Sequence, residues 1–166
     1  MCRREACGDV GILPTNGQAF RVPPYRGAEG DDLIIGIDHI AIAADDAEPL
    51  RQLFAFFGLQ KVYQEDLRED RVRSEQFGAG NANVEVLTAS DPSAPLGRFL
   101  AKHGPGLHHV CFRVDNLETT IAQLQHAGLE LVNPQPREDL QGRRVFLHPR
   151  SGHGVLMGLV ERSDKT

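Results

Sequence analysis

An internal repeat constrains the fold of this chain more than any other feature of its sequence. When residues 37–62 are laid on residues 107–132 without a gap, six aligned positions carry the same amino acid. The identical pairs are His39 and His109, Asp45 and Asp115, Glu48 and Glu118, Gly58 and Gly128, Leu59 and Leu129, and Val62 and Val132. Self-similarity at a fixed spacing indicates that one supersecondary unit occurs twice.

Each copy carries the signals of a strand followed by a helix. Runs rich in β-branched residues open the two copies, IIGIDHIAIA and LHHVCFRV. The acidic or amide turns at 45–46 and 115–116 are suited to cap a helix N-terminus. Apolar residues then recur at helical spacing, and Gly58 and Gly128 supply the left-handed position that ends a helix.

Three short strands are expected after each helix. The ranges are 60–66, 71–78 and 82–88 in the first copy, and 129–133, 143–148 and 154–161 in the second. Between the copies, residues 93–104 predict a linking helix with Leu96, Phe99 and Leu100 on one side. One such unit cannot bury its sheet alone. The predicted fold class is therefore α+β, with two pseudo-symmetric βαβββ modules, at about 33–90 and 105–162, forming a curved mixed sheet around a cleft.

Residues 1–31 differ from the rest of the chain. They are rich in Gly, Pro and Arg and show no period of a strand or helix. No apolar segment of a signal peptide follows the first arginines. Cys2 and Cys7 lack a second ligand pair at metal-binding spacing. We expect a flexible N-terminal extension at 1–31 and a single domain at 32–166.

Charge and composition exclude several classes of function. The formal net charge of −5 argues against a protein that binds a nucleic-acid backbone. No apolar run approaches the roughly 20 residues that span a bilayer. The three cysteines are odd in number and far apart, which argues against a secreted disulfide framework. The chain is therefore expected to be cytoplasmic and to bind neither nucleic acid nor membrane.

The repeat also predicts a metal site. A pseudo-twofold axis would bring His39 and His109 face to face, although a lone strand histidine is usually structural. Imidazoles are suitable ligands for Co, Zn, Ni, Mn or Fe. Glu85 lies between valines in NVEVL, where a charge is costly unless it faces water or binds a cation. Together the three side chains predict a two-histidine, one-carboxylate set with positions open for water or substrate.

Several longer stretches resemble a known superfamily. They are IDHIAIA, NVEVLTASDPSAPLGRFLAKHGPGLHHVCFRVDNLE and QGRRVFLHPRSGHGVLMGLVE. From about residue 35 to 161 the chain resembles the vicinal oxygen chelate (glyoxalase/bleomycin resistance/dioxygenase) superfamily, and within it the methylmalonyl-CoA epimerases. The shared motifs include G-x-H-H and H-P-(K/R)-S-x-G-V-L-(I/V)-E-L. The resemblance implies an isomerase in which a divalent metal stabilises an enolate next to a thioester carbonyl. It implies a small-molecule substrate, with an acyl-CoA as one option, and a homodimer is left open.

Carried over residue by residue, the resemblance places the family's metal ligands on His39, Glu85 and His109. His108 is expected to point to the opposite side of its strand. The family's fourth ligand, the Glu of the last motif, falls on Gly158. Glu161 cannot easily replace it, because a residue three positions further along a strand faces the other way.

The missing carboxylate bears on the mechanism. In the family it also serves as an acid/base, and losing a positioned acid/base costs about 10²–10⁴-fold in rate. A second acid/base of some relatives falls on Ser74 or Glu75. Glu75 is the catalytic candidate, although a solvated carboxylate in a hairpin is the plainer interpretation of this residue.

Substrate contacts and alternative functions stay open. Arg150 and Ser151 of HPRSG are candidate neighbours of an acyl-CoA or another anion, although a surface turn explains them as well. One alternative function is a non-catalytic module that binds and sequesters a small molecule. Another is a glyoxalase-type lyase or an extradiol dioxygenase, which usually need the carboxylate that Gly158 lacks. Bound metal in stoichiometric amount would separate the enzymes from the binding module.

Overall fold

The computed structural model of this protein describes residues 33–139 and 142–163, so the expected extension at 1–31 lies outside the described residues. In chain order the elements are β1 (Ile34–Ala43), α1 (Glu48–Phe56), β2 (Lys61–Leu67), β3 (Val72–Ala79), β4 (Ala82–Ala89), α2 (Pro95–His103), β5 (Gly106–Val114), α3 (Leu117–His126), β6 (Arg137–Asp139), β7 (Gly142–Leu147) and β8 (Leu156–Arg162). The expected order of two βαβββ units joined by a helix is confirmed.

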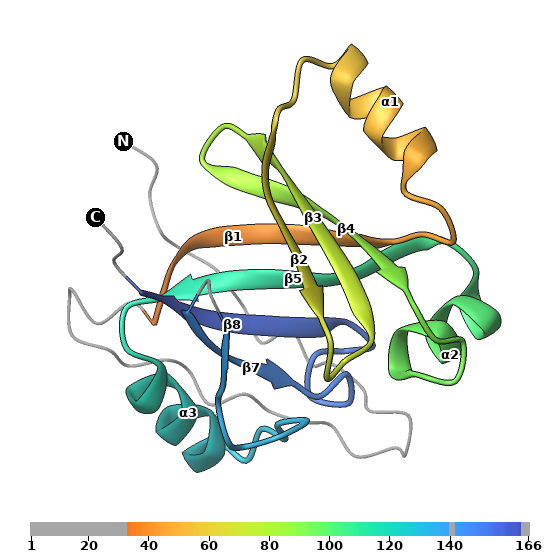
Figure 1. The fold of residues 1–166 in the computed structure, drawn as a ribbon. Helices are drawn as coiled ribbons and strands as arrows, with labels where there is room; N and C mark the ends of the chain where they lie inside the picture. Colours follow the sequence, from red (N-terminus) through yellow and green to blue (C-terminus); the bar gives the residue numbers. More distant parts are fainter. Residues whose placement is uncertain (1–32, 140–141, 164–166) are drawn as a thin grey trace.

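All eight strands form one mixed sheet in the order β2-β3-β4-β1-β5-β8-β7-β6. The modules meet where β1 pairs antiparallel with β5, while β1 pairs parallel with β4 and β5 parallel with β8. Figure 1 shows a strongly twisted sheet in which β2, β3 and β4 cross β1 and β5 at a steep angle, with α1 and α3 at opposite ends of the molecule. The first strands of the two modules therefore lie at the centre of the molecule.

The strand register makes Glu85 and Gly158 equivalent. Ala41 of β1 pairs with Glu85 of β4, and Cys111 of β5 pairs with Gly158 of β8. Positions 41 and 111 correspond in the repeat, so their partners correspond as well. The sequence predicts this equivalence between the closing strands, and the strand register agrees with it, although an ungapped shift of 70 residues would by itself place Val155 opposite Glu85.

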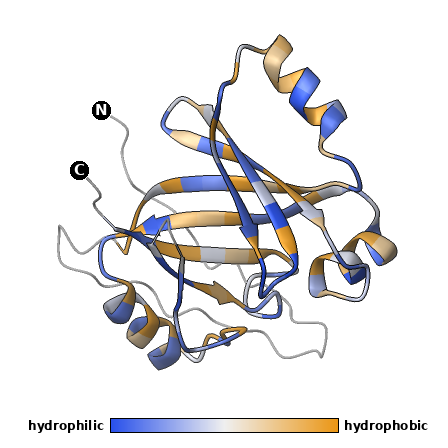
Figure 2. Ribbon diagram, viewed as in Figure 1, coloured by the Kyte–Doolittle hydropathy of each residue, from blue (hydrophilic) through white to orange (hydrophobic). Residues whose placement is uncertain are grey.

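Helices α1 and α3 each cover the outer face of their own module. Phe54 of α1 packs with Phe77 and Val86, and Leu117 and Ile121 of α3 pack in a separate core cluster with residues of β7 and β8. Figure 2 shows that these helices carry apolar and polar residues on different sides, as amphipathic surface helices do. Helix α2 instead packs against the inner face: Leu96 joins a cluster with Ala41, Ala43 and Leu87.

The helix ends follow most of the sequence signals. Asn116 caps α3, and Gly58 and Gly128 adopt the left-handed conformation at φ of 78° and 74°. The first helix differs, because its N-cap is Ala47 and has no side-chain cap. Asp46 instead accepts a hydrogen bond from the Glu48 backbone N–H in a local turn, and the helix starts after it.

One predicted strand is wrong. Residues 129–133 contribute only an isolated bridge between Leu131 and Leu147, and the short β6 lies further along the chain. Pro134 and Pro136 lack the backbone N–H that a paired strand needs, which delays the next strand until Arg137. Among the helices of the described residues, none has the length and apolar character needed to cross a membrane.

Candidate metal centre

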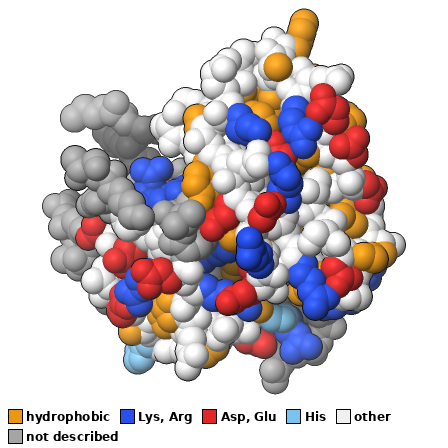
Figure 3. Space-filling model, viewed as in Figure 1, with side chains coloured by type: hydrophobic (Ala, Val, Ile, Leu, Met, Phe, Trp, Pro, Cys, Tyr) orange, Lys and Arg blue, Asp and Glu red, His pale blue; other side chains and the backbone are white. Residues whose placement is uncertain are grey.

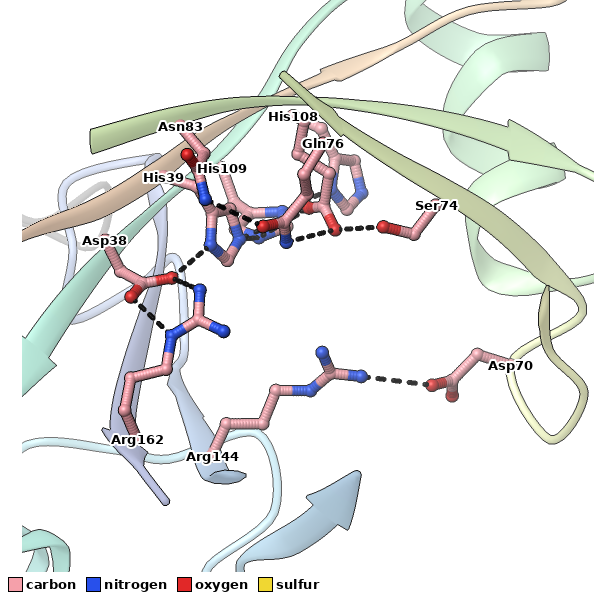
Figure 4. A network of polar contacts seen from close by, with 11 residues as sticks. Asp38, His39, Asp70, Ser74, Gln76, Asn83, His108, His109, Arg144 and Arg162 are labelled. Atoms are coloured by element: carbon pink, nitrogen blue, oxygen red, sulfur yellow. Dashed lines mark hydrogen bonds and ion pairs between the residues drawn. The ribbon is translucent and has the colours of Figure 1, made fainter. Parts of the chain in front are cut away.

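The predicted ligands His39, Glu85 and His109 converge between the central strands. The His39 Nε2 atom lies 3.2 Å from His109 Nε2 and 3.2 Å from Glu85 Oε2, and His109 Nε2 lies 3.8 Å from Glu85 Oε2. All three side chains are almost fully buried. Figure 4 shows the two imidazoles pointing toward each other from their neighbouring strands. The repeat therefore brings together residues that lie 70 positions apart in the sequence.

These donor atoms fit a divalent metal ion. Imidazole nitrogen and carboxylate oxygen bind Zn²⁺ at about 2.0–2.2 Å, so ligand atoms that share one ion lie about 3–4 Å apart. The three observed separations fall within this range. Two imidazoles and one carboxylate are also the ligand types that first-row divalent metals accept. The arrangement is a candidate metal centre in which the protein supplies three ligands.

Asp38 and Arg162 hold the first ligand in place. The Asp38 Oδ2 atom lies 2.8 Å from His39 Nδ1, and the Arg162 guanidinium donates hydrogen bonds of 2.7 and 2.6 Å to the two oxygens of Asp38. A carboxylate on the outer nitrogen fixes the tautomer and the ring orientation of a metal-binding histidine. His39 therefore directs its Nε2 atom toward Glu85 and His109.

A chain of polar side chains orients the second ligand. Ser74 Oγ donates a hydrogen bond of 2.5 Å to Glu85 Oε1, and Gln76 Nε2 lies 3.4 Å from the same oxygen. Asn83 Nδ2 in turn donates to Gln76 Oε1 at 3.0 Å. Because these contacts occupy Oε1, the other carboxylate oxygen of Glu85 faces the two histidines.

Two β-bulges place a supporting residue before each histidine. The pairing of β1 with β5 shifts by one position at Asp38 and again at His108, so each is the extra residue of a bulge. A bulge interrupts the alternation of side chains. His108 therefore lines the same pocket as His109, with its Nδ1 atom 2.9 Å from His109 Nδ1. The expectation that His108 points to the opposite side is wrong.

The surroundings set the charges of the three ligands. Burial raises the pKa of Glu85, but the hydrogen bond and charge of His39 outweigh it and hold this pKa at about 2. Burial lowers the pKa of His109 to about 3. Burial also lowers the pKa of His39, whereas hydrogen bonds to Asp38 and Glu85 raise it to about 9. Glu85 is therefore an ionised carboxylate and His109 a neutral imidazole, which are the forms that bind a metal. His39 has to lose a proton before its Nε2 atom can bind an ion.

Cys111 lies beside this centre. It forms a second group with Asp38 and His39 whose donor atoms lie within 4.8 Å of one another. The His39 Nδ1 atom of this group is already directed at Asp38, however, and burial raises the pKa of the Cys111 thiol. A protonated thiol is a poor ligand, so the set of His39, Glu85 and His109 is the better candidate.

Gly158 faces the inside of the sheet next to this centre. A Cβ atom added to it would lie 2.8 Å from Cys111 Sγ and 3.2 Å from the Phe146 ring. The position is therefore close-packed rather than open. Glu161, three residues further on, points away, and its carboxylate accepts a hydrogen bond of 2.7 Å from the Leu117 backbone N–H at the start of α3.

A pocket of about 270 Å³ opens beside the candidate metal centre. Glu85, His108 and His109 form its polar end, and Arg144 lies in its wall. Most of the other lining is apolar: Leu67, Val72, Leu87, Pro95, Leu96, Val132, Val145, Phe146 and Leu156. Such a site, with apolar walls and a few convergent polar groups, is the usual form of a small-molecule binding pocket.

The structure does not bring Glu75 to this site. On β3, Ser74 and Gln76 face Glu85, so Glu75 points to the opposite side of the sheet. There the Arg51 side chain of α1 donates hydrogen bonds of 2.9 and 2.8 Å to its two oxygens. The hydrogen bond and charge of Arg51 lower the pKa of Glu75, although burial opposes them. This carboxylate ties α1 to the sheet.

The two candidate substrate contacts also lie outside the pocket lining. Arg150 is exposed in the turn before β8. Ser151 Oγ accepts a hydrogen bond of 2.9 Å from the Glu130 backbone N–H, which fastens that turn to the segment after α3.

Sequence reasoning missed Asp38, Arg162 and Arg144. The position of Asp38 directly before a predicted ligand was a visible signal, because carboxylates commonly support metal-bound histidines. Arg144 lies in the predicted strand at 143–148, and Arg162 directly follows the predicted strand at 154–161. Which of them faces the centre depends on strand register, so no local pattern could have identified them.

The sequence of this chain is similar to those of several known proteins. The family model of the Glyoxalase/Bleomycin resistance protein/Dioxygenase superfamily matches residues 38–146. The mitochondrial methylmalonyl-CoA epimerase of Dictyostelium discoideum is 30% identical over 156 residues, which cover 89% of this chain and 94% of that protein. The uncharacterized protein YqjC of Bacillus subtilis (strain 168) is 32% identical over 127 residues, covering 75% of this chain and 91% of YqjC.

Solved structures show the same likeness. The crystal structure of methylmalonyl-CoA epimerase from Mycobacterium tuberculosis superimposes with a TM-score of 0.77 at 28% identity, covering 82% of this chain and 93% of that one. A methylmalonyl-CoA epimerase in complex with methylmalonyl-CoA and NH4+ gives a TM-score of 0.75 at 29% identity, covering 79% and 96%. The curled sheet with three helices is thus shared with these epimerases.

Proposed function

Because the chain belongs to the Glyoxalase/Bleomycin resistance protein/Dioxygenase superfamily, we propose that it is a divalent-metal-dependent isomerase acting at the α-carbon of an acyl thioester. Methylmalonyl-CoA is the substrate that the names of its relatives suggest. The observation that carries the proposal is the convergence of His39, Glu85 and His109 at the polar end of a largely apolar pocket.

The residues of this site have distinct tasks. His39, Glu85 and His109 would hold the metal ion, which would act as a Lewis acid on the thioester carbonyl oxygen and stabilise the negative charge that develops when the α-proton leaves. Asp38 orients His39, and Ser74 orients Glu85, so the ligands need little rearrangement. The apolar walls exclude water, which strengthens charge interactions within the pocket.

Gly158 is proposed to stand where the epimerase motif has a metal-binding glutamate. This interpretation is supported by its register equivalence with Glu85 and by the direction of its Cα–Cβ bond toward Cys111 at the centre. The protein ligands would then carry one negative charge instead of two, and one acid/base group would be missing. We expect epimerisation to be slower by about 10²–10⁴-fold than in a site with both carboxylates.

The same glycine favours a second candidate function. Without the second carboxylate, the fold could bind a small anionic molecule at the metal and release it unchanged. Unlike the metal-free binding module considered from the sequence, this one would keep the metal requirement of the isomerase but would show no exchange at the substrate's α-carbon.

Two measurements on the purified protein test the proposal. Metal content is determined by elemental analysis, and proton exchange at the α-carbon of methylmalonyl-CoA is followed by NMR in D2O. We expect one divalent ion per chain and metal-dependent exchange, both lost in His39→Ala and His109→Ala. The matched control is His126→Ala, because His126 is an exposed histidine at the end of α3, on the outer face.

The outcomes separate the candidate functions. Metal binding without exchange would favour the binding module over the isomerase. Failure to bind any divalent metal, or full metal binding by a variant that lacks both histidines, would contradict the assigned centre.

A further inference from the structure

A second pocket, of about 440 Å³, lies at the other end of the sheet from the pocket described above. Its described lining comes from β1, β2, the β3–β4 hairpin and the ends of β5 and β8, whereas the first pocket is lined by the β2–β3 turn, α2 and the start of β8. In Figure 1 the β3–β4 hairpin and the ends of β5 and β8 lie on the left, and α2 lies on the right. The residues of the second pocket that matter below are Asp38, Asn81, Asn83, Arg113 and Arg162.

The candidate metal centre lies between the two pockets. Glu85 and His109 line the first pocket, and Asp38, which contacts His39, lines the second. No described residue lines both. The second pocket is therefore separate from the space that the proposed function assigns to the acyl group.

The carboxylate of Asp38 is already engaged within the protein. Arg162 donates hydrogen bonds of 2.7 and 2.6 Å to its two oxygens, and His39 Nδ1 lies 2.8 Å from Oδ2, as Figure 4 shows. The Arg113 Nε atom lies further away, at 3.6 Å from Oδ1. A hydrogen bond between a guanidinium and a carboxylate measures about 2.7–2.9 Å. Asp38 therefore serves Arg162 and His39, and does not satisfy Arg113.

Arg113 keeps hydrogen-bond donors for another acceptor. Its Nε–H is buried and has no hydrogen-bond partner, and the long contact with Asp38 is its one ion pair among the described residues. A buried donor without a partner is costly to the folded protein. The side chain as a whole is 41% exposed, so an ion can reach it from water. In a guanidinium, Nε–H and one Nη–H form a fork that fits two oxygens of one anion.

The other groups around the second pocket favour an anion with several oxygens. Asp38 is the one carboxylate of the described lining, and its two oxygens are engaged by Arg162. Asn81 and Asn83 of the β3–β4 hairpin add amide groups, which can donate hydrogen bonds. A carboxylate has two oxygens in one plane, whereas a phosphate presents oxygens in several directions. A phosphate can therefore accept hydrogen bonds from Arg113 and from an amide group together.

Another arginine of similar exposure shows how the outer surface differs. The Arg143 side chain of β7 is 38% exposed, and it forms an ion pair with Glu118 of α3. On the face drawn in Figure 3, acidic and basic side chains are likewise interspersed over the described residues. Arg113 differs from Arg143 because it combines a buried donor that lacks an acceptor with a position in the wall of a pocket.

We propose that the second pocket is an anion site in which Arg113 binds the phosphate group of a small molecule. The Nε–H and a neighbouring Nη–H donate two parallel hydrogen bonds to this group. The volume of about 440 Å³ lies within the range of small-molecule sites, so it leaves room for an organic part beside the phosphate. This ligand is separate from the thioester, since the two pockets lie at opposite ends of the sheet. The inference uses neither the metal ligands nor the first pocket, so it stands apart from the proposed isomerase activity.

Inorganic phosphate is the probe for this site. The purified full-length protein is titrated with sodium phosphate by calorimetry at constant ionic strength, so that charge screening stays equal. We expect the wild type to bind phosphate with a Kd of about 1 mM or below. Arg113→Gln should weaken binding at least about tenfold, because two charged hydrogen bonds are lost. Arg143→Gln, the matched control, should bind like the wild type. Equal binding by the wild type and Arg113→Gln, or no binding by either, would overturn the inference.

Two further variants sharpen the test. Arg113→Lys keeps the charge but not the fork, so its affinity for phosphate should be intermediate, and it carries the test if Arg113→Gln does not fold. His109→Ala removes a candidate metal ligand and should retain phosphate binding. Binding that is lost in His109→Ala and kept in Arg113→Gln would place the phosphate at the metal centre and reject the second site.

Two other anions test the class and the source of the ligand. Acetate should bind more weakly than phosphate, and equal binding of the two would contradict a phosphate site. Free coenzyme A also carries phosphate groups, and its presence should leave the affinity for inorganic phosphate unchanged. Displacement of phosphate by coenzyme A would assign the second pocket to the thioester and overturn the proposal of a separate ligand.

Discussion

Asp38 and His108 occupy equivalent positions in the two modules, and each contacts Nδ1 of the histidine that follows it. The Asp38 carboxylate lies 2.8 Å from His39, and the His108 imidazole lies 2.9 Å from His109. Each is the extra residue of a β-bulge in the β1–β5 pairing. The two candidate metal ligands His39 and His109 are thus supported in the same way by chemically different groups, one anionic and one with a burial-lowered pKa.

Both supporting residues are expected to contribute to metal affinity. Asp38→Asn and His108→Ala should each weaken binding of Co²⁺ or Zn²⁺ by about 10–100-fold, because the ligand behind each loses its fixed orientation. Calorimetric titration of the metal-free protein measures this effect. His126→Ala should bind metal like the wild type. An unchanged affinity in both Asp38→Asn and His108→Ala would show that the bulges do not support the ligands.

Restoring a carboxylate on β8 should strengthen the centre. Gly158→Glu alone is hindered, because its Cβ would lie 2.8 Å from Cys111 Sγ. The double variant Cys111→Ala/Gly158→Glu removes that contact and should bind metal more tightly than either the wild type or Cys111→Ala, the matched control. If the glutamate also serves as an acid/base, α-proton exchange of methylmalonyl-CoA should rise by up to about 10²–10⁴-fold.

The two readouts of this variant have separate meanings. Tighter metal binding with no gain in exchange would retain the metal centre and indicate different chemistry. If neither quantity changes, the equivalence of Glu85 and Gly158 has no functional consequence.

Glu75 is expected to stabilise the fold rather than to take part in the reaction. Its side chain is 2% exposed and accepts two hydrogen bonds from Arg51. Glu75→Gln should lower the free energy of unfolding by about 1–3 kcal/mol, since the buried charged pair is broken. Urea denaturation at pH 7 measures this loss. A normal stability combined with lost proton exchange would instead assign Glu75 a catalytic role.

The contribution of Glu75 should depend on pH in a defined direction. Its pKa in the folded protein is lowered from the ordinary 4.5, so its stabilising effect is present above about pH 4.5 and is lost as the pH falls through the lowered pKa. The stability difference between the wild type and Glu75→Gln should therefore shrink in acid. Glu48→Gln, which removes the exposed partner of the same arginine, should change stability by no more than about 0.5 kcal/mol at any pH.

Removal of residues 1–31 should leave the domain intact. Their sequence lacks the periodic apolar pattern of a core element, so the truncated protein is expected to unfold within about 1 kcal/mol of the full chain. Thermal and urea denaturation of the two forms give the comparison. A much larger loss would show that the segment packs on the domain or completes an interface.

The plan of the molecule can be inferred from its amino-acid sequence. Strand and helix periodicities are local, so IDHIAIA and LHHVCFRV could be identified as strands before any contact was known. Because the pattern occurs twice, His39 and His109 could be predicted to meet. Glu85 could be added because a charge within a β-branched strand requires a partner. These three candidate ligands followed from the repeat and from the cost of a charge in an apolar strand.

The surroundings of these three residues depend on how distant strands pair. Bulges changed the direction of Asp38 and His108, strand register set Gly158 against Cys111, and the turn before β3 brought Asp70 to Arg144. Each of these relationships depends on pairing between distant parts of the backbone, and a shift of one residue reverses which side chains face the pocket. A local pattern cannot contain that information, so the convergence of His39, Glu85 and His109 was predictable and the residues that support them were not.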